Sequence, residues 1–172
     1  DFYGSFKIRN GDWDPSSSNG FFFYLIEKET TGNGYAIGVN ANGSTDKLSL
    51  WTYISGKATE LLAETEFDWN ANTTARIDFS RLSNGAWTLA CTDLATGLSS
   101  QAIATHTLYS DFTEVGLSFF YTATRSGKLW FDDLEVFRKN SGPQLKLVSA
   151  TSSTSIDVWL SEPVGGDPLT SS

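Results

Sequence analysis

Residues 75–89 have the sequence ARIDFSRLSNGAWTL, in which apolar and polar residues alternate on both sides of Asn84-Gly85. A period of two is typical of a β-strand that buries one of its faces. An Asn-Gly pair takes the positive φ angles of a tight hairpin turn at little cost. The stretch therefore predicts two antiparallel strands joined by a short turn, with their apolar residues on a shared buried face.

The same alternation recurs along most of the chain, in short β-branched and aromatic runs separated by clusters of Gly, Asn, Asp and Ser. Helical spacing of apolar residues is almost absent. We expect strands at 2–9, 21–28, 35–41, 47–55, 59–63, 73–81, 87–92, 99–105, 114–123 and 128–138. This pattern predicts an all-β fold in which two antiparallel sheets pack as a sandwich.

Residues 21–26, with the sequence FFFYLI, are apolar at every position. A strand with two apolar faces is expected inside a sheet, where the second sheet covers one face. The other face needs a different cover, and the sequence leaves a ligand, a loop and a neighbouring domain open as candidates.

The composition excludes several classes of function. A formal net charge of −8 and a sequence pI of about 4.5, with no cluster of Lys and Arg, argue against a nucleic-acid partner. No apolar run approaches the roughly 18 residues of a membrane-spanning helix, so membrane insertion is not expected. Cys91 is the only cysteine, which excludes an internal disulfide, and its place in the alternation predicts a buried, unreactive thiol.

A polar stretch with a Gly-Pro breaker, residues 139–143, interrupts the pattern before new strands are expected at 145–150 and 156–160. We therefore expect a sandwich at 1–138, a linker at 139–143 and a second segment at 144–172.

Four short motifs follow one another in the first segment. They are Asp14-Pro15-Ser16-Ser17-Ser18-Asn19, Gly34-Tyr35-x-Ile37-Gly38, Asp46-Lys47-Leu48-Ser49-Leu50-Trp51 and Trp130-Phe131-Asp132-Asp133-Leu134-Glu135-Val136. In this order they resemble the concanavalin A-like and laminin-G-like sandwiches of large secreted or cell-surface proteins of Bacteroidota. The last motif also looks like the final strand of jelly-roll carbohydrate-binding modules. The resemblance implies a jelly-roll accessory module of an exported protein, located outside the cell or at its surface.

The second segment is similar to the first two strands of bacterial Ig-like repeats, over residues 145–164. Such a domain needs about seven strands, so we expect an incomplete Ig-like domain here.

Asp132 and Asp133 are adjacent in the last expected strand, and an extended backbone would point one of them toward the interior or an edge. In the jelly-roll modules that this strand resembles, the matching aspartate ligates a structural Ca²⁺. The resemblance implies that Asp12, Asp14 and nearby carbonyl groups complete a shell of oxygen ligands. The alternative is that the aspartates accept hydrogen bonds from backbone or Arg groups and no metal is bound.

Trp51 and Tyr53 lie opposite Leu48 and Leu50 in the alternation, which aims the two aromatic rings away from the core. Exposed rings are typical platforms for the apolar face of a sugar. With the loop 10–19 folded over the strand at 21–28, the site would also contain Trp13, Tyr24, Asn19 and Arg125. The alternative is that these aromatics fill a second small core or an interdomain contact.

Glu64, Glu66 and Asp68 share one face of an extended segment, a spacing similar to the acid-rich strand of laminarinase-type glycosidases. The pattern departs from that family because Asp stands last and not in the middle, and a solvated edge is the alternative that we favour. His106 is the only histidine and has no partner nearby in the sequence for a catalytic triad or a metal centre, which predicts a surface or turn residue.

The leading hypothesis is a non-catalytic module that binds a polysaccharide or a cell-surface glycan and requires no cofactor. A structural cap or spacer that contacts neighbouring domains or another protein is the alternative. A β-glucanase-like hydrolase that uses the three acidic residues is the third hypothesis.

Overall fold

The structure, a computed structural model, describes residues 1–28, 30–139, 145–152 and 155–160. The chain divides into two compact units, Asp1–Phe137 and Arg138–Ser172. Most of the expected linker at 139–143 and the final residues, 161–172, lie outside the described residues.

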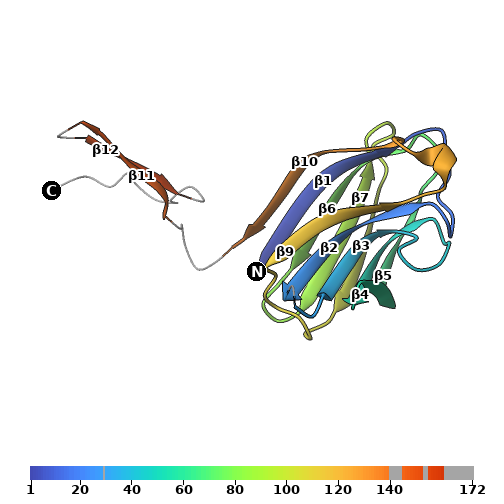
Figure 1. The fold of residues 1–172 in the computed structure, drawn as a ribbon, viewed down its shortest axis with the longest axis horizontal. Helices are drawn as coiled ribbons and strands as arrows, with labels where there is room; N and C mark the ends of the chain where they lie inside the picture. The colour runs from blue at the N-terminus through green and yellow to red at the C-terminus, as the bar shows by residue number, and fades with distance from the viewer. Residues whose placement is uncertain (29, 140–144, 153–154, 161–172) are drawn as a thin grey trace. The chain divides into compact units, whose positions relative to one another are not determined.

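The first unit is built from strands arranged in two five-stranded sheets (Figure 1). The elements in chain order are β1 (Phe2–Asn10), β2 (Gly20–Lys28), β3 (Asn33–Val39), β4 (Lys47–Ile54), β5 (Lys57–Asp68), β6 (Thr74–Arg81), β7 (Ala86–Asp93), β8 (Ser99–Thr105), β9 (Glu114–Phe120), the 3-10 helix η1 (Ala123–Arg125) and β10 (Leu129–Arg138). The β1 sheet has the strand order β10-β1-β6-β7-β8, and the β2 sheet has the order β5-β4-β3-β2-β9. The predicted all-β antiparallel sandwich is confirmed.

The hairpin predicted around Asn84-Gly85 is present as β6 and β7. The two strands pair antiparallel from Ala75 opposite Asp93 to Arg81 opposite Trp87. At the turn, Gly85 has a φ of +84°, and the backbone N–H of Leu82 donates to the carbonyl of Ala86 at 2.8 Å. Only the glycine of the Asn-Gly pair takes a positive φ within this turn.

The core lies between the two sheets and is rich in aromatic contacts. The ring of Phe23 in β2 lies 5.4 Å from Phe6 in β1 and 5.6 Å from Phe79 in β6, between ring centroids. The rings of Tyr35 and Trp87 meet edge to face at 4.7 Å. Each fully buried aromatic side chain contributes about 1.5–3 kcal/mol through loss of apolar area from water. These contacts hold the two sheets face to face.

His106 lies just after β8, outside the strands and half-buried, and its ring also takes part in this packing. Its Nδ1 lies 2.8 Å from the hydroxyl of the buried Tyr35, and its ring meets that ring edge to face at 5.5 Å. The hydroxyl of Tyr35 also donates to the carbonyl oxygen of His106 at 3.3 Å. The sequence predicted a surface or turn residue, and the neighbours of His106 in the sequence could not reveal this long-range partner.

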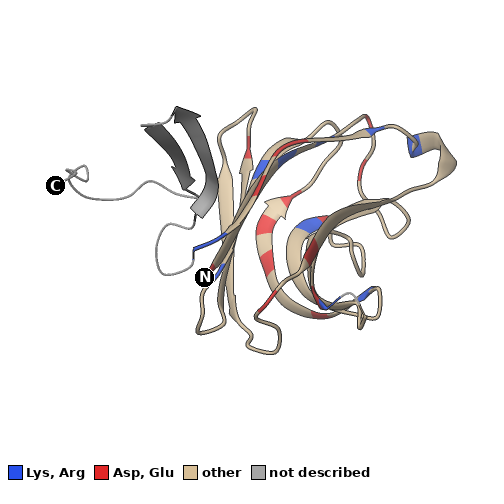
Figure 2. Cartoon of the chain, turned by 60° about the vertical axis from the view of Figure 1, so that its left-hand side comes forward, with Lys and Arg blue, Asp and Glu red and all other residues tan. Residues whose placement is uncertain are grey.

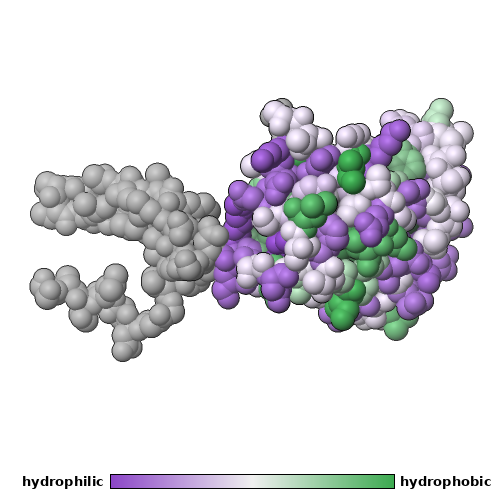
Figure 3. Space-filling model, turned by 90° about the horizontal axis from the view of Figure 1, so that it is seen from below, coloured by the Kyte–Doolittle hydropathy of each residue, from purple (hydrophilic) through white to green (hydrophobic). Residues whose placement is uncertain are grey.

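The edge strands leave several apolar side chains exposed. β9 forms one edge of the β2 sheet, and while Leu117 packs against the core, Val115 is 40% exposed and Tyr121, just beyond the strand, is 46% exposed. β8 forms an edge of the β1 sheet and leaves Ile103 75% exposed. Figure 3 shows hydrophobic residues among hydrophilic ones on the face seen there.

The second unit contains β11 (Leu145–Ser152) and β12 (Ser155–Leu160), which pair antiparallel. Strands were expected at these positions, and their assignment to an Ig-like domain stays a prediction. Within the described part of the chain, no helix has the length and apolar character that crossing a membrane requires.

The environment of Cys91 makes a testable prediction. Cys91 is fully buried in the core, and this burial, with smaller effects of Asp93 and Asp78, raises the pKa of its thiol to about 12. Because the thiolate is the reactive form, a thiol-specific reagent at pH 8 should label the native chain far more slowly than the chain unfolded in guanidinium. The labelling rates are measured by absorbance. Equal rates for the native and the unfolded chain would contradict the buried position of Cys91.

Candidate functional site

The outer face of the β2 sheet, which points away from the β1 sheet, has a strip of small residues at its centre. Tyr35, Ile37 and Val39 of β3 point into the core, so the alternate positions Gly34, Ala36 and Gly38 point outward. All three of these small residues are nevertheless buried. Side chains from the neighbouring strands must therefore cover the strip.

Four aromatic rings gather on this outer face. We call them the aromatic cluster: Phe22 and Tyr24 from β2, Tyr53 from β4 and Phe120 from β9. The rings of Tyr24 and Tyr53 stack with centroids 5.9 Å apart and planes 7° apart. Phe22 lies 5.6 Å from Tyr53 and 6.4 Å from Phe120. All four side chains are half-buried, so the cluster covers the strip and still meets solvent.

Glycines make room for these rings. A Cβ added at Gly116 would lie 2.3 Å from the hydroxyl oxygen of Tyr24, and one at Gly20 would lie 2.5 Å from the Phe120 ring. A Cβ at Gly38 would lie 2.1 Å from the carbonyl oxygen of Phe21, because β2 and β3 approach closely there. The glycines therefore let Tyr24 and Phe120 lie close over the sheet.

Trp51 lies on the same outer face but does not present its ring to solvent. Trp51 of β4 stands opposite Ala36 of β3, and Ala36 in turn stands opposite Tyr24 of β2. Its side chain is only 8% exposed, and its Nε1 is buried without a hydrogen-bond partner. Leu61, opposite Trp51 on β5, is 46% exposed and extends the apolar surface. Trp51 thus contributes little exposed area to this face.

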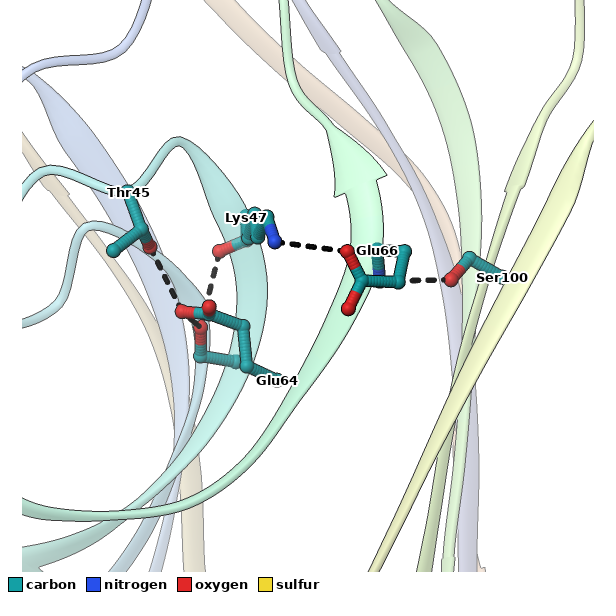
Figure 4. A network of polar contacts seen from close by, with 6 residues as sticks. Thr45, Lys47, Glu64, Glu66 and Ser100 are labelled. Atoms are coloured by element: carbon teal, nitrogen blue, oxygen red, sulfur yellow. Dashed lines mark hydrogen bonds and ion pairs between the residues drawn. The ribbon is translucent and has the colours of Figure 1, made fainter.

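A polar network borders the apolar surface (Figure 4). The carboxylate of Glu64 accepts hydrogen bonds from the hydroxyls of Thr45 at 2.8 Å and Ser49 at 3.1 Å. Lys47 forms an ion pair with Glu66 at 3.0 Å, and this partner raises the pKa of the lysine. Figure 2 shows the acidic residues of β5 as a run of bands along the strand. Charged groups thus lie at the β5 side of the face.

The three other proposed sugar contacts, Trp13, Asn19 and Arg125, do not join the cluster. Trp13 is 1% exposed, stacks on Phe119 at 5.6 Å and donates its Nε1–H to the carbonyl of Lys128 at 2.7 Å. The side-chain oxygen of Asn19 accepts from the backbone N–H of Thr122 at 2.8 Å. Arg125 ends the 3-10 helix η1. These residues fasten loops at the end of the sandwich, so the loop 10–19 does not place Trp13 over β2.

The four aspartates proposed for calcium are not brought together. Among the described residues, no group of three or more His, Cys, Asp or Glu side chains could hold a metal ion. Asp12 pairs with Lys128 at 2.7 Å, which lowers the pKa of its carboxyl group, and Asp14 accepts the backbone N–H of Ala71 at 2.6 Å.

Asp132 and Asp133, one of which was expected to face the interior or an edge, are exposed on β10, which is an edge strand of the β1 sheet. Asp133 has a φ of +52°, which interrupts the alternation of β10, and its carboxylate pairs with Lys7 on the outer face of β1. Asp132 accepts the backbone N–H of Asp133 at 2.8 Å, and both aspartates are exposed. A local irregularity of the strand therefore replaces the buried charge that strict alternation would impose.

Sequence reasoning missed two members of the cluster, Phe22 and Phe120. Phe22 has the same parity as Tyr24, and Phe120 has the parity opposite to the core residue Leu117. The alternation contained this signal. Phe22 and Tyr24 form the second apolar face of strand 21–28 and stay half-exposed, so its cover by a ligand, a loop or a neighbouring domain stays a prediction.

Comparisons with known proteins give little guidance. No family model matches the chain, and no curated protein matches it. Among solved structures, scytalido-glutamic peptidase with a transition state analog inhibitor matches with 13% identity and a TM-score of 0.39. The match covers 80% of this chain and 75% of that chain. At this TM-score the likeness carries no argument about fold or function.

The close approach of β2 and β3 predicts a large effect of Gly38→Ala. The added methyl would meet the Phe21 carbonyl and the Phe22 Cα, which is 2.5 Å away, so the backbone must move. We expect a loss of about 1–3 kcal/mol in the free energy of unfolding, measured by urea denaturation. The control is Gly11→Ala, whose nearest atom is 3.4 Å away and which should stay within about 0.5 kcal/mol. Equal effects of the two variants would refute the proposed close approach.

The hydroxyl of Tyr53 predicts a dependence of stability on alkaline pH. Burial raises the pKa of this phenol, and nearby Tyr24 adds to the rise. The native state thus holds the phenol proton more tightly than the unfolded state. The contribution of the protonated hydroxyl to stability is therefore present at neutral pH and is lost as the pH rises above the ordinary pKa of about 10. Between about pH 9 and 11, the melting temperature should fall less in Tyr53→Phe than in the parent chain, as measured by thermal unfolding. An identical loss in both would contradict the burial of this hydroxyl.

Proposed function

We propose that the chain is a non-catalytic module that binds a polysaccharide or a cell-surface glycan through the outer face of the β2 sheet. The observation that carries this proposal is the aromatic cluster, a group of half-exposed rings of which three lie on strands inside a sheet. Rings held this way present apolar area at low cost in conformational entropy, because their side chains are already fixed by their neighbours. The apolar face of a sugar ring is a suitable ligand for such a surface.

The register places polar groups within reach of the same ligand. Phe22, Gly38, Ser49 and Glu64 follow one another across β2, β3, β4 and β5. Three strand spacings separate the first Cα from the last, or about 14 Å. Only a glycine and a serine stand between, so a sugar chain lying on Phe22 could extend toward the carboxylate of Glu64. A largely apolar site with a few polar groups at its border is typical of ligand-binding sites.

The polar network supports binding over catalysis. Glu64 already accepts hydrogen bonds from two hydroxyls, and Glu66 is paired with Lys47. Both carboxylates therefore already have polar partners within the chain. We therefore favour the binding module over the hydrolase as the function of this chain. A role for Glu64 in catalysis would first require detectable glucanase activity.

A contact surface for another protein domain is the second candidate, and Trp51 favours it. A tryptophan that is only 8% exposed shows that part of this face is packed like a core. A neighbouring domain could cover the remaining exposed area of the cluster, which would make the chain a cap or spacer.

The test is binding of the full chain to a glycan array and to insoluble polysaccharides. We expect retention on at least one glycan, and roughly tenfold weaker binding in Tyr53→Ala and Tyr24→Ala because each removes a ring that contacts the ligand. Tyr121→Ala removes an exposed tyrosine outside the cluster and should bind normally. Addition of EDTA should leave binding unchanged.

Failure of the parent chain to bind any glycan would favour the protein-contact candidate. Equal binding by all three variants would place the glycan away from the cluster.

A further inference from the structure

A second candidate surface lies on the opposite side of the sandwich, on the outer face of the β1 sheet. Three surface cavities of about 350, 340 and 460 Å³ occur there. The first is lined by Tyr3 and Ser5, the second by Lys7 and Arg9, and the third by Arg9 together with Gly11. The cavities therefore follow the outward side of β1 from end to end. We call them together the β1 groove.

The neighbouring strands form the two sides of the β1 groove. β6 lies on one side, with Ser80 opposite Tyr3 and Thr74 opposite Arg9. β10 lies on the other side and contributes Phe137 to the first cavity and Trp130 to the other two. From Tyr3 to Arg9 the strand rises by about 20 Å, since each residue advances about 3.3 Å.

Each end of the β1 groove has exposed aromatic area. At one end the rings of Tyr3 and Phe137 stack with centroids 5.5 Å apart, and Phe137 is 53% exposed. At the other end the Arg9 guanidinium lies 4.3 Å from the ring centroid of Trp130, which is 46% exposed. Contact with a cation fixes the position of an aromatic ring at an otherwise exposed site.

The middle of the β1 groove is polar and contains two ion pairs. Lys7 pairs with Asp133, and Arg76 pairs with Asp78 at 2.9 Å. Solvent-exposed ion pairs of this kind are weak, so their donors and acceptors can also bind a ligand. Glu135 adds a carboxylate to the first cavity.

These features narrow the class of ligand. β1 lies between β10 and β6, so its backbone groups are used within the sheet and an extended peptide would find no main-chain partners there. The paired charges give no excess that would select an anionic or cationic polymer. A neutral glycan chain matches both features, since its hydroxyls donate and accept hydrogen bonds and its ring faces are apolar.

We propose that the β1 groove binds a neutral, linear oligosaccharide, with its ends on the Tyr3–Phe137 pair and on Trp130. This site has the same ligand class as the proposed function but shares no residue with the aromatic cluster. Because the two surfaces lie on the outer faces of opposite sheets, a chain that uses both can link two glycan strands.

The test is an NMR titration of the ¹⁵N-labelled full chain with neutral hexasaccharides of glucose, xylose and mannose, beside a hexagalacturonate and an extended hexapeptide. We expect shifts at Tyr3, Lys7, Arg9 and Trp130 with at least one neutral hexasaccharide. Trp130→Ala and Tyr3→Ala should weaken this binding roughly tenfold, while Tyr121→Ala and the cluster variant Tyr53→Ala leave it unchanged.

Absence of shifts at β1 and β10 with every neutral hexasaccharide would overturn the proposal, whatever the outcome at the cluster. Tighter binding of the hexagalacturonate or the hexapeptide to these strands would overturn the assignment to a neutral glycan. Because the shifts are read in the parent chain, a variant that fails to fold does not remove the test.

Discussion

The register of β2 is the constraint on which both the core and the outer surface depend. Phe23 points inward against Phe6 and Phe79, while Phe22 points outward into the aromatic cluster. Since side chains alternate with a period of two, a slip of one residue would exchange these two sets of rings. The close approach at Gly38 opposes such a slip, because a residue with a side chain would collide with the backbone of β2. One strand therefore fixes the packing of the sandwich and the composition of its outer face.

Periodicity in the sequence was sufficient to predict the sandwich and most of its strands. The hairpin around Gly85 and the buried position of Cys91 follow from alternation and turn chemistry, which are local properties. The stacked rings of Tyr24 and Tyr53 come from strands that are not adjacent in the sheet. The alternation along each strand predicted that both rings lie on the outer face. Their contact could not be predicted, because it depends on the register of β3 between them and on the small outward residues of that strand.

Loops and local irregularities were beyond prediction from the sequence. Trp13 lies in a loop, where no periodicity indicates direction, and its burial depends on Phe119 and the carbonyl of Lys128. The positive φ of Asp133 changes the side on which a carboxylate emerges, and its residue type gives only a weak signal for this. The predicted calcium ligands rested on a resemblance, and the structure uses each of these aspartates for separate hydrogen bonds or ion pairs.

The antiparallel pairing of β1 with β10 has a mechanical consequence. Tyr3 stacks on Phe137, so the first residues of the sandwich and the point where the chain leaves it lie side by side. A pulling force applied between residues 1 and 138 would separate β1 and β10 from this end, breaking their hydrogen bonds one after another. Separating two strands from one end needs less force than sliding them along each other, because in sliding all the hydrogen bonds between the strands must break together. Under tension between these two points, the sandwich would open at β10 first, and the β1 groove would be lost before the aromatic cluster.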